Sequence, residues 1–296
     1  MSLFTEFPAM GRQDLRDFKK AIDAGFRDFS RQFGESLEEF FSPLLQFLVW
    51  LEKLLISTPW PVIILLVAAL AWFGSRSVKI AVGSVLSFLA IGYFGMWKDT
   101  MSTLAIISVA TLLCIALGIP LGVLMARSDR VQAVVTPVLD VMQTIPAFVY
   151  LIPVVMLLGI GKVPGLIAVC IYAMPPIVRL TNLGIRLVEK EALEAADAFG
   201  ANYKQRLFGV QIPLALPNIF AGVNQTIMMA LSMVVIASMI GVAGLGVPVL
   251  RSISNQYLAL GLMNGLAIVA LAIIFDRVSQ KYGERLQSHR RGTQHD

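Results

Sequence analysis

Long apolar segments without a charged side chain recur along this sequence, and they restrict the chain to folds that span a membrane. The clearest is the segment 101–126, which contains no Asp, Glu, Lys or Arg. A helix of about 20 apolar residues crosses the hydrocarbon core of a bilayer. Over the whole chain 57% of residues are hydrophobic and 15% are charged, whereas about 25% are charged in soluble proteins. The sequence therefore predicts an all-α integral membrane protein.

Seven segments are expected to cross the membrane, with short loops between them. They are residues 57–73, 80–94, 101–126, 141–160, 163–178, 214–240 and 257–275. Gly118 and Gly122 in the third are spaced for close contact with another helix, and Pro175 and Pro176 are expected to break or bend the fifth. No charged side chain lies in any of the seven. This disfavours coupling to protons or ions, because such carriers keep ionisable groups inside the membrane.

The region before these spans, residues 1–56, is predicted to be a charged, amphipathic extension. Apolar side chains recur in it every three or four positions, which is typical of a helix: Phe18, Ile22, Phe26, Phe29 and Phe33. Residues 40–56 are more apolar, but Glu52 and Lys53 lie near their end. We favour a helix that lies in the membrane interface for this part, and a further span is the alternative.

Basic residues predict the orientation, because they concentrate in cytoplasmic loops. If the basic tail 277–296 and the polar segment 187–213 are inside, the basic turns at 76–79 and 127–130 are inside too. The transmembrane domain then covers residues 57–276. We expect the N-terminus outside and the C-terminus in the cytoplasm, whereas a spanning segment 40–56 would move the N-terminus inside.

One polar, alanine-rich segment interrupts the apolar pattern between the fifth and sixth spans. A run of helix formers starts at Glu189 and ends at Gly200, which can take the left-handed turn that closes a helix. A second short helix is expected over residues 202–212, ended by Pro213. Small side chains share a face that lets another backbone approach: Ala192, Ala195 and Ala196. An ordinary solvated loop helix is the alternative.

The spacing in this segment resembles the EAA loop of ABC importer permeases. Glu194-Ala195-Ala196 is followed by Gly200 and then by Val210-x-Ile212-Pro213. In that family the loop docks on the ATPase subunit as a coupling helix. The resemblance implies this role for six residues: Glu194, Ala195, Ala196, Phe199, Gly200 and Pro213.

Other segments resemble the glycine betaine, proline betaine and choline branch of these permeases, over roughly residues 55–287. They are DVMQTIP at 140–146, YLIP at 150–153, MPPIVRLTNLGIR at 174–186 and GLG at 244–246. The resemblance implies the type I importer fold and a homodimer in the bacterial inner membrane. It also implies a pair of ATPase subunits that carry ATP and Mg, a soluble solute-binding protein, and import of quaternary ammonium or betaine-like solutes.

The chain itself is expected to be a transport subunit without catalytic residues, bound metal or cofactor. Gly161-Lys162 looks like the end of a phosphate-binding loop, but Met156 and Val163 replace the glycine and the hydroxyl residue that such a loop needs. Cys114 and Cys170 lie in apolar segments and are expected to be buried thiols. Basic residues are not clustered with aromatic ones, so nucleic acid is not an expected partner.

Uncharged polar and aromatic side chains within the spans are candidates for a solute path. They are Gln143, Thr144, Phe148, Tyr150, Tyr172, Asn224 and Met228. An aromatic face attracts a trimethylammonium group by about 0.5–2 kcal/mol. Hydrogen bonding between helices is the alternative role for the polar members.

Two other functions compete with an ATP-driven importer subunit. The first is a secondary carrier or channel that needs no ATPase, and the second is a scaffold that anchors an ATPase without moving solute. Solute uptake into vesicles distinguishes the three functions. An importer subunit would need ATP and its partners, a carrier or channel would need only a solute or ion gradient, and a scaffold would give no uptake.

Overall fold

The computed structural model describes the backbone of residues 9–291 and the side chains up to Gly283. The first eight residues of the expected N-terminal extension and the last five of the basic tail lie outside the described residues. Within this range every regular element is a helix, and their bounds, in chain order, are α1 (Arg12–Ser57), α2 (Trp60–Ser75), α3 (Val78–Tyr93), α4 (Trp97–Arg127), α5 (Asp129–Thr144), α6 (Ala147–Leu158), α7 (Lys162–Arg186), α8 (Lys190–Ala198), α9 (Tyr203–Arg206), the π-helix η2 (Leu207–Gln211), α10 (Ile212–Ser238), α11 (Gly246–Asn255) and α12 (Leu258–Arg291).

The core of the molecule is formed by α4, α7 and α10, and α7 packs against both of the others. Glycines allow the close approach that membrane helices use in place of a hydrophobic driving force. A Cβ at Gly118 of α4 would lie 2.5 Å from the Ile177 side chain of α7, and one at Gly122 would lie 2.7 Å from the Val178 carbonyl oxygen. The close contact expected at this glycine pair is therefore confirmed.

The two cysteines lie in the same α4–α7 contact, and both are free and buried. Each thiol donates to a carbonyl of the opposite helix: Cys114 Sγ lies 3.7 Å from the Cys170 oxygen, and Cys170 Sγ lies 3.7 Å from the Ala110 oxygen. The prediction of two buried thiols is thus confirmed.

Two prolines in α7 do not break the helix. Pro175 and Pro176 were expected to break or bend this span, but the helix continues through both from Lys162 to Arg186. Both side chains are buried, in the part of α7 that packs closely on α4 and α10. Neighbouring helices hold a proline-containing membrane helix together in this way.

The expected fourth span, 141–160, is instead broken. Its first residues belong to α5, which ends at Thr144, and α6 starts at Ala147 after a bend of 99°. Pro146 disfavours the helical conformation at the residue before it, and Ile145 is accordingly extended, with φ −67° and ψ 128°.

The number of spans also differs from the expected seven. By length and composition, five helices within residues 9–291 qualify, or six if the bent α5–α6 pair counts as one. The first two expected spans correspond to α2 and α3, which have 16 residues each. A helix of that length rises only about 24 Å. Helix α1 ends at Ser57 and α2 starts at Trp60, between Pro59 and Pro61, so the residues before Pro59 do not lengthen this helix.

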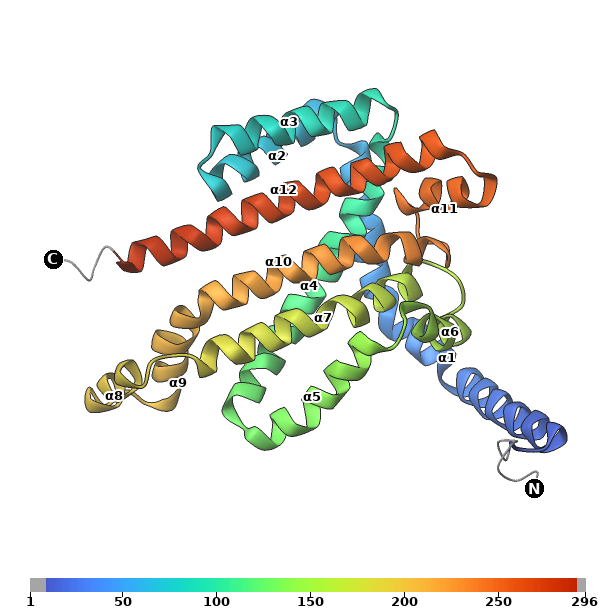
Figure 1. Ribbon diagram of the computed structural model, residues 1–296, viewed down its shortest axis with the longest axis horizontal. Helices are drawn as coiled ribbons and strands as arrows, with labels where there is room; N and C mark the ends of the chain where they lie inside the picture. The colour runs from blue at the N-terminus through green and yellow to red at the C-terminus, as the bar shows by residue number, and fades with distance from the viewer. Residues whose placement is uncertain (1–8, 292–296) are drawn as a thin grey trace, which may run out of the picture.

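The two short helices form a hairpin beside α12 at the edge of the molecule (Figure 1). The end of α2 lies beside the C-terminal part of α12. A Cβ at Gly74, near the end of α2, would lie 2.6 Å from the side chain of Val278. The α2–α3 turn therefore lies at the same end of the molecule as the C-terminal part of α12.

The N-terminal region is one continuous helix, α1, of 46 residues. Residues 40–56 are not a separate helix, and Pro43 lies inside α1 without ending it. The Glu52 side chain accepts a hydrogen bond from Ser102 Oγ at 2.7 Å and forms an ion pair with Lys162. Those two residues lie near the starts of α4 and α7. Ser30 Oγ also donates to the Met156 carbonyl of α6 at 2.9 Å, so α1 is attached at the end of α7 opposite to α8.

Candidate functional site

The polar segment between α7 and α10 projects from the helical core, and α8 and α9 lie at its tip (Figure 1). No side chain of α8 is buried. Glu194 and Ala195 are exposed, whereas Ala192 and Ala196 are partly buried, so the expected face of three alanines is divided. Phe199 follows the helix with 92% of its surface exposed. An apolar ring in that position is suited to insertion into a partner's pocket.

Gly200 ends α8 with a backbone conformation that favours glycine. Its φ is +75°. The Gly200 N–H donates to the Asp197 oxygen and the Ala201 N–H donates to the Ala196 oxygen, both at 3.0 Å. This hydrogen-bond pair is the Schellman closure of a helix. The sequence prediction of a left-handed turn at Gly200 is confirmed.

The second part of the segment differs from its prediction. Asn202 starts α9 with a capping box, in which it and Gln205 exchange hydrogen bonds between side chain and backbone. The chain then passes through η2 directly into α10, and Pro213 lies in the first turn of α10 instead of ending a helix. A proline is tolerated in the first turn of a helix. The Ile212 N–H donates to the Leu207 carbonyl, five residues back instead of four. The hydrogen-bond register of the helix therefore shifts by one residue just before Pro213.

Two contacts hold α9 against its neighbours. Arg206 Nη1 donates to both carboxylate oxygens of Asp197, at 3.0 and 3.3 Å, which links α9 to α8. The Arg127 guanidinium lies 3.9 Å from the centre of the Tyr203 ring, which links α9 to the end of α4. The segment is thus attached to the core by side chains as well as by its own two ends.

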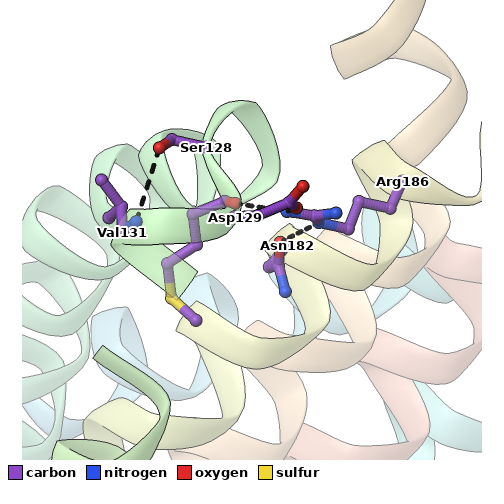
Figure 2. Close-up of polar contacts among 6 residues, drawn as sticks. Ser128, Asp129, Val131, Asn182 and Arg186 are labelled. Carbon is purple, nitrogen blue, oxygen red and sulfur yellow. Dashed lines mark hydrogen bonds and ion pairs between the residues drawn. The ribbon is translucent and has the colours of Figure 1, made fainter. Parts of the chain in front are cut away.

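A hydrogen-bonded cluster around Arg186 joins α7 to α4 and α5 immediately before the polar segment (Figure 2). Arg186 Nη2 donates to the Met125 carbonyl at 2.9 Å and to Asp129 Oδ1 at 2.7 Å, while Nε donates to Asn182 Oδ1 at 3.1 Å. Ser128 caps α5 beside it by accepting from the Val131 N–H at 3.4 Å. A movement of the end of α7 therefore displaces the α4–α5 corner.

A second arginine makes a similar connection earlier on α7. Arg179 Nη2 donates to Asp140 Oδ1 at 2.5 Å. The two arginine–aspartate pairs connect α5 to α7 at both ends of α5. Sequence reasoning did not assign these residues, although Arg179 and Arg186 lie in the segment 174–186 and Asp140 in the segment 140–146.

The candidate path residues fall into two groups. Gln143 and Thr144 end α5, and Phe148 and Tyr150 begin α6, so four of them surround the bend. Gln143, Thr144 and Phe148 are exposed on the single chain. The Tyr150 hydroxyl is buried and has no hydrogen-bond partner among the described residues. Tyr172 is partly buried on α7, which packs against α6.

The other two candidates lie on α10. Asn224 and Met228 line a groove of about 590 Å³ between α10 and α12, to which no residue of α5 or α6 contributes within the described part of the chain. Asn224 Nδ2 donates to Asp276 Oδ1 at 2.9 Å, and its Oδ1 atom is buried without a partner in the same described part. The structure therefore does not bring all seven candidates together within one chain.

Known proteins with similar sequences are bacterial permeases. The chain is 52% identical over 237 residues to the glycine betaine/proline betaine transport system permease protein ProW of Escherichia coli, covering 80% of this chain and 67% of that protein. It is 47% identical over 232 residues to the glycine betaine/carnitine transport permease protein GbuB of Listeria monocytogenes, covering 78% and 82%. It spans 63% of the length of the Salmonella typhimurium ProW protein, at 52% identity over 76% of this chain.

Solved structures of similar fold are ABC transporters. An inward-facing structure of the MetNI methionine transporter matches with a TM-score of 0.57 at 19% identity, over 62% of this chain and 93% of that one. An amino acid ABC transporter solved with histidines matches with a TM-score of 0.53 at 21% identity, over 66% and 96%. These matches confirm the expected type I importer fold. Residues 118–287 match the family model of the binding-protein-dependent transport system inner membrane component, and the chain belongs to this family.

Proposed function

We propose that this chain is the membrane subunit of an ATP-driven importer for glycine betaine, proline betaine or a related quaternary ammonium solute such as choline. Membership of the family implies an ATPase subunit and a soluble binding protein as partners. The solute class rests on the names of the relatives and on the resemblance of residues 140–186 to their branch. The observation that supports the ATPase-driven role most directly is α8, an exposed helix that is followed by the exposed Phe199 and by Gly200.

The coupling step follows from how α8 is attached. An ATPase subunit that binds Phe199 and Glu194 would pull on a helix fixed by Gly200 at one end and joined to α7 at the other. The Asp197–Arg206 and Arg127–Tyr203 contacts would pass this displacement to α10 and α4, and the Arg186 cluster would pass it to α5. All the helices around the candidate path would then move together.

The path itself is proposed to form between two copies of the chain. Gln143 and Thr144 are polar and exposed at the α5–α6 bend, in a segment that qualifies as a broken span. Exposed polar groups are unfavourable toward lipid, so a second copy or water should cover them. Phe148, Tyr150 and Tyr172 would supply aromatic faces for a trimethylammonium group. Asn224 and Met228 would line the cytoplasmic end of the route.

Uptake by purified components tests this proposal. The chain would be reconstituted into proteoliposomes with its ATPase subunit and binding protein, and uptake of radiolabelled glycine betaine would be followed with and without ATP. We expect uptake only when ATP and both partners are present. Uptake driven by a gradient with this chain alone would support the carrier alternative, and ATPase binding without any uptake would support the scaffold alternative.

Single substitutions test the path residues. Tyr150→Phe removes only the unpartnered hydroxyl, and Asn224→Ala removes the amide. Both should lower uptake at unchanged ATPase binding if these groups contact solute. Tyr257→Phe is the matched control, because Tyr257 is exposed and lies outside the two groups. Unchanged uptake in both test variants would show that neither the Tyr150 hydroxyl nor the Asn224 amide contacts the solute.

A further inference from the structure

An aromatic pocket of about 620 Å³ lies where α1 ends, α2 begins, and α3 meets α4. Four aromatic side chains line it: Trp60, Phe88, Tyr93 and Trp97. Ser57 and Thr58 add two hydroxyl groups, and the described residues that line it include no charged side chain. Its size is in the range of small-molecule binding pockets. This pocket is separate from α8 and from the candidate path.

An apolar slot of about 230 Å³ lies next to this pocket, between α2, α4 and α12. Phe88 lines both cavities and is only 2% exposed, so it forms their common wall. Ser108 is the one polar side chain among the described residues that line the slot. Val278 lines its far end, where α2 and α12 touch at Gly74.

The lining of the slot is suited to a hydrocarbon occupant. An apolar cavity of about 150 Å³ stays dry in a protein and binds small apolar molecules, and this slot is larger. Since α4 and α12 are membrane spans by length and composition, the apolar molecules that surround the slot are lipid acyl chains. An acyl chain inserted there would contact Ala71 of α2 and Leu271 of α12, which are 2% and 1% exposed.

The pocket determines which headgroup would accompany that chain. Trp and Tyr rings gather at the depth of lipid headgroups, and their faces attract ammonium groups. The hydroxyl oxygens of Ser57 and Thr58 can accept hydrogen bonds from an ammonium N–H. No Lys or Arg lines the pocket within the described chain, so an anionic headgroup would find no opposite charge.

We propose that the pocket and slot together bind one zwitterionic phospholipid with an ammonium headgroup, of the phosphatidylethanolamine class. The headgroup occupies the aromatic pocket and one acyl chain occupies the slot. The lipid thereby fills the gap between the α2–α3 hairpin and the α4–α12 side of the core. The hairpin is then held to the core in part by a lipid molecule.

Native mass spectrometry of the purified full-length chain tests this proposal, with phosphatidylethanolamine and phosphatidylglycerol added in turn after delipidation. The wild-type chain should keep one phosphatidylethanolamine and prefer it to phosphatidylglycerol. Ala71→Phe, which fills the slot, should abolish this retention, whereas Ala69→Phe, on an exposed position of the same helix, should not. Tyr93→Ala should weaken binding about 3- to 10-fold, and the adjacent Phe94→Ala should leave it unchanged.

Tyr93 is 87% exposed, so its variant should fold even if Ala71→Phe does not. Equal phosphatidylethanolamine retention by Ala69→Phe and Ala71→Phe would contradict the binding of an acyl chain in the slot. Equal or better binding of phosphatidylglycerol, or unchanged affinity in Tyr93→Ala, would overturn the headgroup assignment. A delipidated wild-type chain that takes up no phospholipid would overturn the whole proposal.

Discussion

The backbone conformation at Gly200 favours glycine, whereas the space around it would admit a larger side chain. Its φ of +75° lies in the left-handed region, while a Cβ added there would meet no atom within 4 Å. At Arg186, by contrast, the geometry of the side chain determines which residue type fits. Its guanidinium donates in three directions, to Met125, Asp129 and Asn182, which a lysine ammonium cannot reproduce from the same position.

Replacing Gly200 tests the conformational requirement. Gly200→Val should disfavour the helix closure by about 1–2 kcal/mol, because an L-residue is strained in the left-handed region. Gly200→Asn should cost less, since asparagine adopts this conformation more readily. We expect the valine variant to bind less ATPase subunit and to lose uptake relative to ATP hydrolysis, both measured in proteoliposomes. Normal coupling in Gly200→Val would contradict the docking role of this turn.

Replacing Arg186 and its partners separates charge from hydrogen bonding. Asp129 has 89% of its side chain exposed, so Asp129→Ala should lower stability by less than about 1 kcal/mol. Arg186→Lys should cost about 1–3 kcal/mol, because the buried amide of Asn182 loses its donor. Thermal unfolding in detergent, followed by tryptophan fluorescence, measures both. Equal destabilisation by the two variants would show that the ion pair dominates.

At the scale of helices, the α5–α6 corner is the one sharply bent pair among the described apolar helices. It is bent by 99° at Ile145–Pro146, and α5 is joined to α7 through Arg179–Asp140 and Arg186–Asp129. Four candidate path residues surround the bend. A change of the bend angle would therefore move them relative to α7 and α10 without disturbing the packed core.

Removing the proline tests this bend. Pro146→Ala restores an N–H group and lifts the restriction on Ile145, so the two helices should straighten toward one. Between spin labels at positions 134 and 152 we expect the distance to rise from about 18 Å to about 27 Å, from the helical rise and the bend. Pulsed electron resonance measures this distance. An unchanged distance would show that packing, not Pro146, sets the bend.

At the scale of the whole molecule, the two ends of the bundle have different attachments. The start of α7 carries Lys162, which pairs with Glu52 of α1, and its other end leads to α8. Since α7 is a span by length and composition, α1 and α8 lie at opposite membrane faces if α7 crosses the bilayer. We propose that α8 faces the cytoplasm and that the Glu52 end of α1 lies at the outer face, in agreement with the distribution of basic loops.

Cysteine labelling in intact cells tests this orientation. In a chain without Cys114 and Cys170, a cysteine at Ile160, which is 75% exposed, should react with a membrane-impermeant maleimide added outside. A cysteine at Phe199, which is 92% exposed, should react only after the cells are opened. Labelling of both positions from outside would contradict the proposed orientation.

The sequence by itself determined the features that depend on local chemistry. Long charge-free apolar runs such as 101–126 predict a membrane helix from composition alone, and Gly200 specifies a helix end because the left-handed turn excludes most side chains. The close contact at Gly118 and the buried thiols followed from residue size and polarity. The resemblance of the segments around Glu194 and Asp140 was sufficient to predict the fold family.

Only the tertiary structure decided the features that depend on distant partners. The chain breaks at Pro146, whereas the helix α7 continues through Pro175 and Pro176, because neighbouring helices hold it together. Glu52 and Lys162 are 110 positions apart and become a pair only when α1 lies along the core. The division of the candidate path residues and the lipid-sized slot likewise arise from how the helices are placed, which no local pattern encodes.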